Sequence, residues 1–267
     1  MLNRLTADVR EMFQEQLTYR ELLMQMTRRD LMLRYKQTIM GFGWAVFMPI
    51  LNTLIFTVIF QRVAPLDTDL PYPIFSYTGL IAWNLTASSL RFAVSSLSAN
   101  TNLVTKVYFP REIFPFSAVF VSLVDFAVAS IILVGMMLYY RIAPGPALLF
   151  LPVVLIVQIT FTAGVSLLLA MGNLFFRDIK YIFEVVLMLW MFASSVLYPI
   201  SMVGGRLGLL LQFNPMTPII EAYRSVILRN QLPAFGPFGA ASFLAFLTLA
   251  VAWVWFHRAE FQFAESV

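Results

Sequence analysis

The chain has 267 residues, of which 60% are hydrophobic and only 12% are charged. A soluble domain carries about 45–50% apolar and about 25% charged residues, so the charges here are too few to cover an ordinary soluble globule. Intrinsic disorder is excluded as well, because it requires low hydrophobicity and a high net charge. The composition therefore indicates an integral membrane protein.

Reactive side chains are scarce. Cysteine is absent and His257 is the single histidine, which excludes disulfides, thiolate metal sites and clusters of imidazoles within one chain. The net charge of +4 is typical of basic cytoplasmic loops that face anionic lipid, and we predict no nucleic-acid partner. We predict no catalytic, cofactor or metal site in this chain.

The first 36 residues combine apolar positions with many charges, and they contain no short apolar run with a small-residue cleavage site. We therefore predict no signal peptide. The pattern predicts an amphipathic helix within residues 1–36 that lies along the membrane surface. This helix has two possible roles, a simple membrane anchor or a contact with a partner.

Six stretches are apolar enough to cross the hydrocarbon core, which takes about 20 residues. They are residues 37–61, 71–99, 113–140, 147–175, 178–198 and 237–257. Six crossings place both termini on one side of the membrane. Twelve of the 18 Lys and Arg residues fall on that side and five on the other, so both termini are predicted to be cytoplasmic, with residues 260–267 as a tail.

Two connections are not plain loops. Residues 100–115, on the cytoplasmic side, hold apolar residues between polar ones, and Pro110 is placed to end a short helix. Exposed apolar residues in such a loop are typical of a partner contact, the alternative being a tight turn on lipid headgroups. Residues 199–236, on the outer side, contain two apolar runs separated by Asn214 and Pro215. This pattern favours a re-entrant hairpin beside a gated path over a simple outer cap.

Three ionisable residues, Arg91, Asp125 and Glu184, fall inside predicted spans. Such residues are costly in hydrocarbon and usually face a cavity or a partner. At about 1.5 Å per residue, Arg91 and Asp125 lie roughly 13 Å and 18 Å from the cytoplasmic ends of two antiparallel spans. We therefore predict a structural Arg91–Asp125 pair, with a proton relay as the alternative.

Four stretches resemble the membrane subunits of bacterial polysaccharide-export ABC transporters, in the same order and at consistent spacing. They are RDL-x2-RYKQT-x2-GFGW at residues 29–44, KVYFPREIFP at 106–115, FRDIKY at 176–181 and NPMT at 214–217. In that family these stretches form the start of the first span, the cytoplasmic coupling loop, the loop before the fifth span and the external gate hairpin. The similarity extends over nearly the whole chain.

The resemblance implies an all-α integral membrane fold of the type-2 ABC exporter kind, with six transmembrane helices, an interfacial helix, a coupling helix and a re-entrant hairpin. It implies a homodimer that encloses a channel, with two ATP-binding ABC subunits docked on the cytoplasmic face. Its substrate would be a lipid-linked polysaccharide of the O-antigen, capsule or teichoic-acid type, exported across the bacterial cytoplasmic (inner) membrane. The chain has no Gly-x-x-x-x-Gly-Lys-Ser/Thr loop, so ATP and magnesium are assigned to the partner and this chain is predicted not to be an enzyme.

The residues predicted to carry this function fall into three groups. ATPase coupling, with aromatic anchors inside a charged rim, is assigned to Lys106, Val107, Tyr108, Phe109, Arg111, Glu112, Arg177 and Asp178. The external gate is assigned to Asn214, Pro215 and Tyr223. Channel-lining aromatic side chains, on which sugar rings stack loosely enough to slide, are assigned to Phe56, Phe60, Phe183, Trp190 and Tyr198. The alternatives are a local helix cap by Asp178 and packing of the aromatic side chains against lipid or a core.

Three other functions are alternatives to polysaccharide export. A type-2 ABC permease for a smaller hydrophobic drug or lipid would share the fold, the coupling loop and the partner. A membrane-embedded enzyme that modifies lipid or glycan would need convergent acids, histidines or a metal site. A secondary transporter would show an inverted repeat or paired interrupted spans, and the sequence shows no obvious sign of either.

Overall fold

The structure is a computed structural model that describes residues 14–36, 38–63, 65–66, 68–106, 109–205, 208, 211 and 213–266. These residues form helices joined by turns and short irregular segments, and they contain no strand. The elements are α2 Arg20–Tyr35, α3 Gly43–Val58, η1 Ile59–Val63, α4 Tyr72–Val94, η2 Ser98–Asn100, α5 Thr101–Lys106, α6 Ile113–Tyr139, η3 Pro146–Phe150, α7 Leu151–Phe175, α8 Ile179–Phe192, η4 Ile200–Met202, α10 Met216–Ile227 and α11 Phe235–Ser266.

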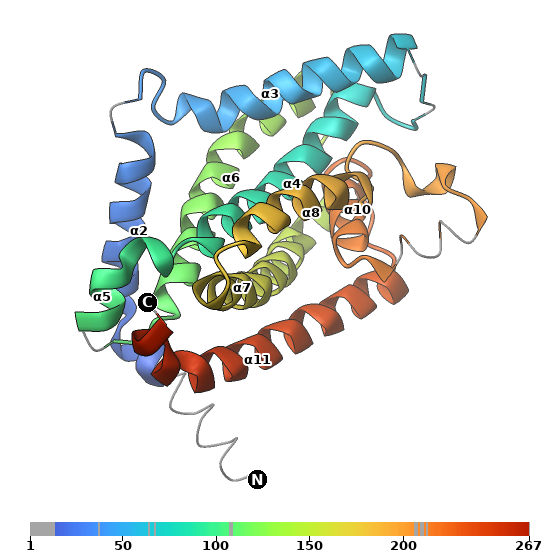
Figure 1. Cartoon of the computed structure of the whole chain (residues 1–267). Coiled ribbons are helices and arrows are strands. Elements are labelled where there is room, and N and C mark those ends of the chain that lie inside the picture. Colours follow the sequence, from blue (N-terminus) through green and yellow to red (C-terminus); the bar gives the residue numbers. More distant parts are fainter. Residues whose placement is uncertain are drawn as a thin grey trace.

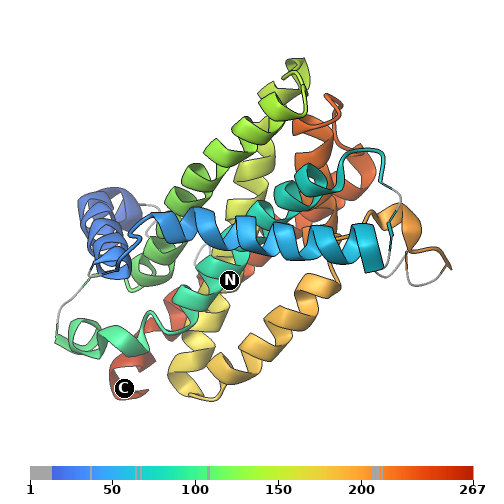
Figure 2. The same ribbon diagram turned by 90° about the horizontal axis from the view of Figure 1, so that it is seen from above.

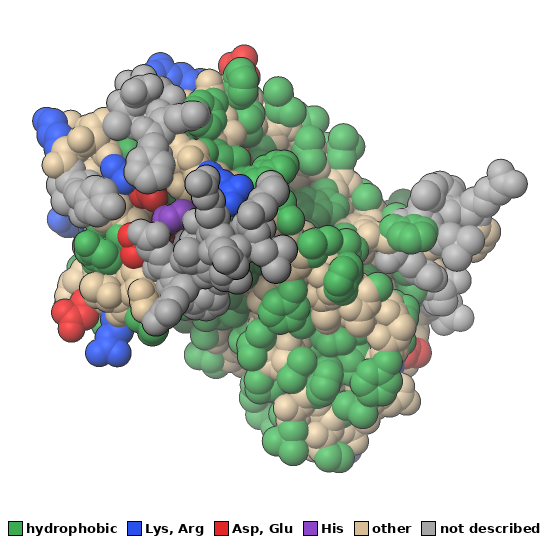
Figure 3. Space-filling model, turned by 90° about the horizontal axis from the view of Figure 1, so that it is seen from below, with side chains coloured by type: hydrophobic (Ala, Val, Ile, Leu, Met, Phe, Trp, Pro, Cys, Tyr) green, Lys and Arg blue, Asp and Glu red, His purple; other side chains and the backbone are tan. Residues whose placement is uncertain are grey.

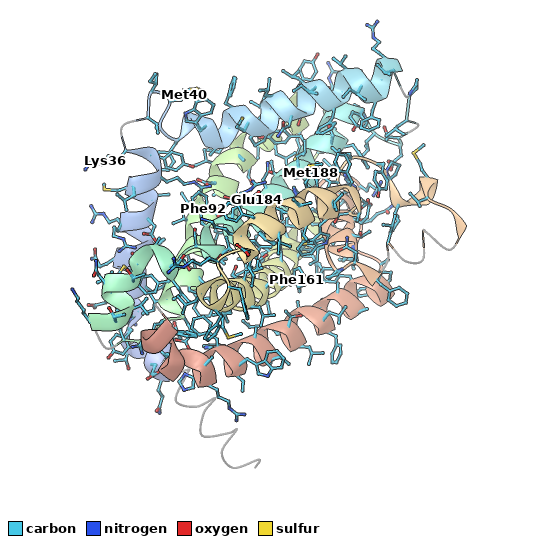
Figure 4. All side chains as sticks on the ribbon, in the orientation of Figure 1. Lys36, Met40, Phe92, Phe161, Glu184 and Met188 are labelled. Carbon is cyan, nitrogen blue, oxygen red and sulfur yellow. The ribbon has the colours of Figure 1, made fainter. Side chains whose placement is uncertain are left out.

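Helices α3 and α11 form two opposite edges of the molecule, with α4, α6 and α7 between them (Figure 1). The view from above places α8 away from α6, with α4 and α7 between them (Figure 2). Helix α2 meets α3 at a corner, where Figure 4 labels Lys36 and Met40. The backbone is extended at Lys36 and enters the left-handed region at Gly41, with φ of +51°, a conformation that glycine adopts without a steric penalty.

The apolar core has two parts. The larger cluster is built mainly from α4 and α10, with contributions from α6, α7, α8 and α11. The smaller one lies where α5 and the start of α6 meet the ends of α7 and α11. This second region, together with the α7–α8 turn, is called the coupling end below, because it contains the segment predicted to contact the ATP-binding partner.

Four described helical stretches are long and apolar enough to cross a membrane by themselves: Gly43–Val63, Ile113–Tyr139, Pro146–Phe175 and Phe235–Glu260. The other two predicted crossings, α4 and α8, do not meet that criterion. Helix α4 has 23 residues, but several of its side chains are polar. Helix α8 has 14 residues, or about 21 Å at the helical rise, against a hydrocarbon core of about 30 Å. The chain is a multi-pass membrane protein, and the count of six crossings stays a prediction.

Two helices end earlier than predicted because polar side chains take up their last carbonyl groups. Helix α8 ends at Phe192, not near residue 198, and the Asn214 amide donates to the carbonyl of Ala193 at 2.9 Å. Helix α4 ends at Val94 instead of near residue 99, and the Ser96 hydroxyl donates to the carbonyl of Ala93 at 2.7 Å. Such local side-chain bonds compete with the helical ladder.

Helix α11 extends further than predicted and includes most of the stretch assigned to a tail at residues 260–267. Phe263 is fully buried in the cluster of the coupling end, and Glu260 is held by Arg111. The predicted tail is therefore part of the packed structure.

Candidate transport path and coupling face

The coupling segment packs into its own chain more tightly than predicted. Phe109 is only 3% exposed, and its ring lies 5.5 Å from that of Phe114 within the second core cluster. The prediction that Phe109 is an exposed anchor for a partner is wrong, because Leu97, Val104 and the end of α11 already cover it. Val107 and Tyr108, the other apolar coupling residues, lie outside the described residues.

The predicted charged rim is also largely internal. The backbone N–H of Arg111 and its Nη1 both donate to Oε1 of Glu260, at 3.0 and 2.9 Å, and its Nη2 donates to the carbonyl of Val104 at 3.3 Å. Glu112 is 1% exposed and faces His257. These two residues therefore attach the coupling segment to α11, and the sequence could not show this because α11 lies almost 150 residues further along the chain.

Of the described residues predicted to couple to the ATPase, the exposed charged ones come from two elements. Lys106 ends α5, and Arg177 and Asp178 form the α7–α8 turn. Asp178 makes no side-chain hydrogen bond that caps α8, so the alternative of a local cap is not observed. The role of these three residues in partner binding stays a prediction.

Asn173 connects the two exposed elements through hydrogen bonds. It was not among the residues predicted from the sequence. Its Nδ2 donates to Oγ of Ser98 in η2, and its Oδ1 accepts the backbone N–H of Lys180 in α8, both at 3.3 Å. Because Asn173 is 2% exposed, it holds the chain before α5 and the start of α8 from inside. The two exposed elements therefore share one end of the bundle.

A groove of about 410 Å³ lies between α2 and α3 on one side and α4 and α6 on the other. Its lining mixes aromatic rings with charged, amide and hydroxyl groups. The aromatic and polar lining residues are Arg34, Tyr35, Trp44, Asn52, Asn84, Ser88, Arg91, Ser122, Asp125 and Phe126. Figure 4 labels Phe92 of α4 and Glu184 of α8, which contact the lining residues Arg34 and Arg91.

The predicted Arg91–Asp125 pair is not formed, although both residues line the groove. Asp125 forms an ion pair with Arg34 and accepts a hydrogen bond from the Tyr35 hydroxyl. Arg91 donates from Nε to both carboxylate oxygens of Glu184, at 3.2 and 3.0 Å. The prediction failed because two other helices supply the partners, Arg34 of α2 for Asp125 and Glu184 of α8 for Arg91.

The five aromatic residues predicted to line a channel are not part of this groove. Phe183 is 6% exposed in the main core, so its assignment to a channel wall is wrong in this conformation. Trp190 is half-buried and donates from Nε1 to Oδ1 of Asn214 at 2.9 Å. Phe56 and Phe60 stack on each other at 6.3 Å, and the hydroxyl of Tyr198 donates to the carbonyl of Phe192. For these four, the channel role stays a prediction.

The segment predicted as the external gate is organised by Asn214. Its Nδ2 donates to the carbonyl of Ala193 and to Oγ of Ser194, while its Oδ1 accepts the backbone N–H of Met216 at 3.1 Å. Asn214 therefore links the end of α8 to the start of α10, which begins directly after Pro215. Tyr223 is fully buried on α10, edge-on to Phe126 at 5.9 Å.

The most deeply buried charge of the described residues is Arg224, which the sequence reading counted only as an outer-loop arginine. It is 0% exposed. Its Nη1 and Nη2 donate to the carbonyls of Ser195 and Val196, each at 2.6 Å, and its Nε donates to the carbonyl of Phe75 at 3.3 Å. Its carboxylate partner is Glu221, at 2.6 Å. A buried cation is tolerated only with such full pairing, so Arg224 fixes α10 to α4 and to the turn after α8.

The pairing continues from Arg224 to the surface at the end of α10. Arg229 donates to both carboxylate oxygens of Asp69, at 2.6 and 3.1 Å, and lies 3.5 Å from Glu221. The hydrogen bond from Arg229 holds the pKa of the Asp69 carboxyl below its usual value, and the same bond raises the pKa of Arg229. Asp69 therefore ties the connection between α3 and α4 to the end of α10.

The comparisons with known proteins identify the class. Residues 21–228 match the family described as ABC-2 type transporter. Because the match includes most of the chain, the protein belongs to the ABC-2 type transporter family, whose membrane subunits work with an ATP-binding ABC partner.

Three proteins are similar to this chain over most of its length. The chain is 32% identical to the O-antigen export system permease protein RfbA of Myxococcus xanthus, over 97% of this chain and 98% of the relative. It is 28% identical to a protein of the same name from Klebsiella pneumoniae, over 92% and 94%. It is 22% identical to the polysialic acid transport protein KpsM of Escherichia coli, over 85% and 87%. The first two relatives are named as permeases and the third as a transport protein.

Proposed function

We propose that this chain is the membrane subunit of an ATP-driven exporter that moves a lipid-linked polysaccharide across the bacterial cytoplasmic membrane. Similarity over nearly the full length to permeases named for O-antigen and polysialic acid transport supports this substrate class. ATP is hydrolysed by a separate chain, and both termini lie in the cytoplasm.

The groove between α2, α3, α4 and α6 is the structural observation that carries the proposal. A pyranose ring has apolar C–H faces, which stack on aromatic rings, and equatorial hydroxyls, which bond to amide and charged groups. The groove offers Trp44, Tyr35 and Phe126 for the first contact and Asn52 and Asn84 for the second. A small hydrophobic drug would have no use for so many polar groups, which are costly to leave unpaired.

The coupling end is the docking face of the ATP-binding partner, which supplies ATP and magnesium. Lys106, Arg177 and Asp178 project from two elements that Asn173 holds together. Phe176, which is 70% exposed beside them, provides an apolar contact. Interfaces of this kind combine an aromatic anchor with a polar rim, so Phe176 takes the role that the sequence reading gave to Phe109.

Two copies of the chain enclose the path. The groove lies along one face of a single chain, and a second copy placed against α3 and α8 closes it. The chain contains no cysteine, so single cysteines can test this arrangement cleanly. Met188→Cys on α8, at a site 60% exposed, is expected to form disulfide-linked dimers in membranes. Phe243→Cys, at a site 68% exposed on α11, is the matched control and is expected to stay monomeric. Equal cross-linking of the two would contradict this dimer.

The function is tested by deleting the gene and following the polymer. The expected result is that lipid-linked polysaccharide accumulates on the cytoplasmic side of the membrane and that the wild-type gene restores export. Restoration should fail with a variant of the groove, Asn84→Leu, that inserts normally. Normal surface polysaccharide in the deletion strain would contradict the proposed substrate class.

A further inference from the structure

We propose that Glu112, His257 and Glu260 form a binding site for a divalent transition-metal cation, with Zn²⁺ as the probe. Glu112 precedes the first residue of α6, while His257 and Glu260 lie one turn apart near the end of α11. The three ligand atoms lie within 4.8 Å of one another. The site was not visible in the sequence because Glu112 is separated from the other two by more than 140 residues.

The distances between these atoms suit a shared cation better than direct hydrogen bonds. Nδ1 of His257 lies 3.5 Å from Oε1 of Glu112 and 3.8 Å from Oε2 of Glu260. An N–H···O bond is about 2.7–3.2 Å long, so both contacts are too long. Ligands of tetrahedral zinc, at roughly 2.0–2.2 Å from the metal, lie about 3.3–3.5 Å from each other. Only a small inward movement is needed for these three side chains to bind one metal ion.

Polar atoms of the site are buried without a hydrogen-bond partner. Glu112 is 1% exposed, and its Oε2 and Nδ1 of His257 have no hydrogen-bond partner in the described structure. An unpaired buried carboxylate oxygen is costly. A cation bound by the Glu112 carboxylate and by Nδ1 of His257 would compensate the negative charge of the first and the unpaired nitrogen of the second, since a neutral imidazole nitrogen and a carboxylate are ordinary zinc ligands.

The surroundings also favour a cation. Arg111 donates twice to Oε1 of Glu260, which leaves Oε2 on the side facing His257. Bonds of this kind orient a metal ligand from behind. The carboxylate of Glu15 adds a third negative charge that acts on His257. Figure 3 shows the histidine, in purple, among acidic and basic side chains at the end of the molecule that is richest in charge.

A metal here would join the start of α6 to the end of α11, directly behind the coupling segment. Arg111 and Phe109 lie within three residues of Glu112, so the same ion would fix the base of the face proposed to meet the ATP-binding partner. Only this consequence rests on the proposed function. The binding of the metal does not depend on what the protein transports.

The test uses the full chain in lipid nanodiscs, with its affinity tag removed. The protein is incubated with ZnCl₂, freed of unbound metal and analysed by mass spectrometry for zinc. About one zinc per chain is expected for the wild type, and at least tenfold weaker zinc binding for Glu112→Gln and for His257→Gln. Glu21→Gln, which removes an exposed acid of α2, is the matched control and should bind zinc like the wild type. With no cysteine and no second histidine in the chain, few other sites can compete.

A second measurement needs no variant that might misfold. Co²⁺ added to the wild-type protein should give the visible absorption of a low-symmetry site with nitrogen and oxygen ligands, and excess Zn²⁺ should remove it. Less than about 0.1 zinc per wild-type chain at micromolar free zinc would overturn the proposal. Stoichiometric zinc that persists in His257→Gln would overturn it as well. In either case the cluster would be explained by an imidazolium between two carboxylates.

Discussion

Asp125→Asn tests one of the polar contacts that hold α2 against the bundle. The substitution keeps the size of the side chain but removes the charge that pairs with Arg34. Removing one partner of a buried ion pair costs about 3–5 kcal/mol. Here the two side chains keep exposures of 20% and 15%, and Arg34 keeps a 2.6 Å hydrogen bond to Ser88. We therefore expect a smaller cost, about 2 kcal/mol.

This cost should appear as local opening of α2, because Arg34 and Tyr35 are its last residues and the helix has no buried residue. About 2 kcal/mol corresponds to a roughly 30-fold change in the opening equilibrium. Hydrogen exchange of the α2 amides, measured in nanodiscs, should therefore speed up by about that factor, while exchange in α7 stays unchanged. Asp178→Asn, an exposed acid outside the pair, should leave α2 protected. Unchanged α2 exchange in Asp125→Asn would refute the argument that this ion pair anchors the helix.

Further substitutions test the remaining contacts. Phe109→Ala should lower the stability of the whole chain by about 3–5 kcal/mol, seen as a lower midpoint of thermal unfolding, whereas an exposed Phe109 would leave the midpoint unchanged. Arg177→Glu should leave that midpoint unchanged and weaken binding of the ATP-binding subunit by roughly tenfold; wild-type affinity in a pull-down titration would remove Arg177 from the docking face. Gly164→Ala should destabilise by about 1–3 kcal/mol, because a Cβ there would lie 2.7–2.9 Å from the backbone of α11, while Gly135→Ala, with open space around it, should be neutral. The lowered pKa of Asp69 means that its contribution is present above about pH 4 and is lost as the pH falls through the folded-state pKa. Since that carboxylate is 53% exposed, the effect stays below about 1 kcal/mol. Asp69→Asn should be less stable than the wild type at pH 7, and the difference should shrink as the pH falls through the folded-state pKa of Asp69; a constant difference between the two would contradict the assignment.

Much of the architecture could be predicted from the sequence because the positions of the helices depend on local patterns of apolar and turn-forming residues. The composition excluded a soluble fold, and long apolar runs located α3, α6, α7 and α11. The Asn-Pro step at residues 214–215 correctly placed the start of α10. The spacing of four short motifs was enough to identify the family, which the match over residues 21–228 confirms.

The predictions that failed concern contacts between elements that are far apart in the sequence. Arg91 and Asp125 were paired from their depths along two neighbouring spans, but depth says nothing about α2 and α8, which supply the actual partners Arg34 and Glu184. The burial of Phe109 and the pairing of Arg111 depend on the end of α11. A hydropathy pattern cannot reveal that one end of the chain folds back over a loop in its middle.

Arg224 on α10 shows the same limit. An arginine in a polar connection is normally assigned to solvent, yet three backbone carbonyls from α4 and the turn after α8 enclose this one. Gly79, a glycine inside a predicted span, is the residue whose presence could have indicated a buried side chain packed against α4. A Cβ at that position would lie 2.5 Å from Nη2 of Arg224 and from the carbonyl oxygen of Val196, so the glycine in α4 makes room for the guanidinium.

The most direct test of the whole account is reconstitution of the chain in liposomes with and without its ATP-binding subunit. We predict that lipid-linked polysaccharide becomes accessible on the far side of the bilayer only when both proteins and hydrolysable ATP are present, from complexes that contain two copies of this chain. Transport by this chain alone, or transport that does not depend on ATP, would contradict the account.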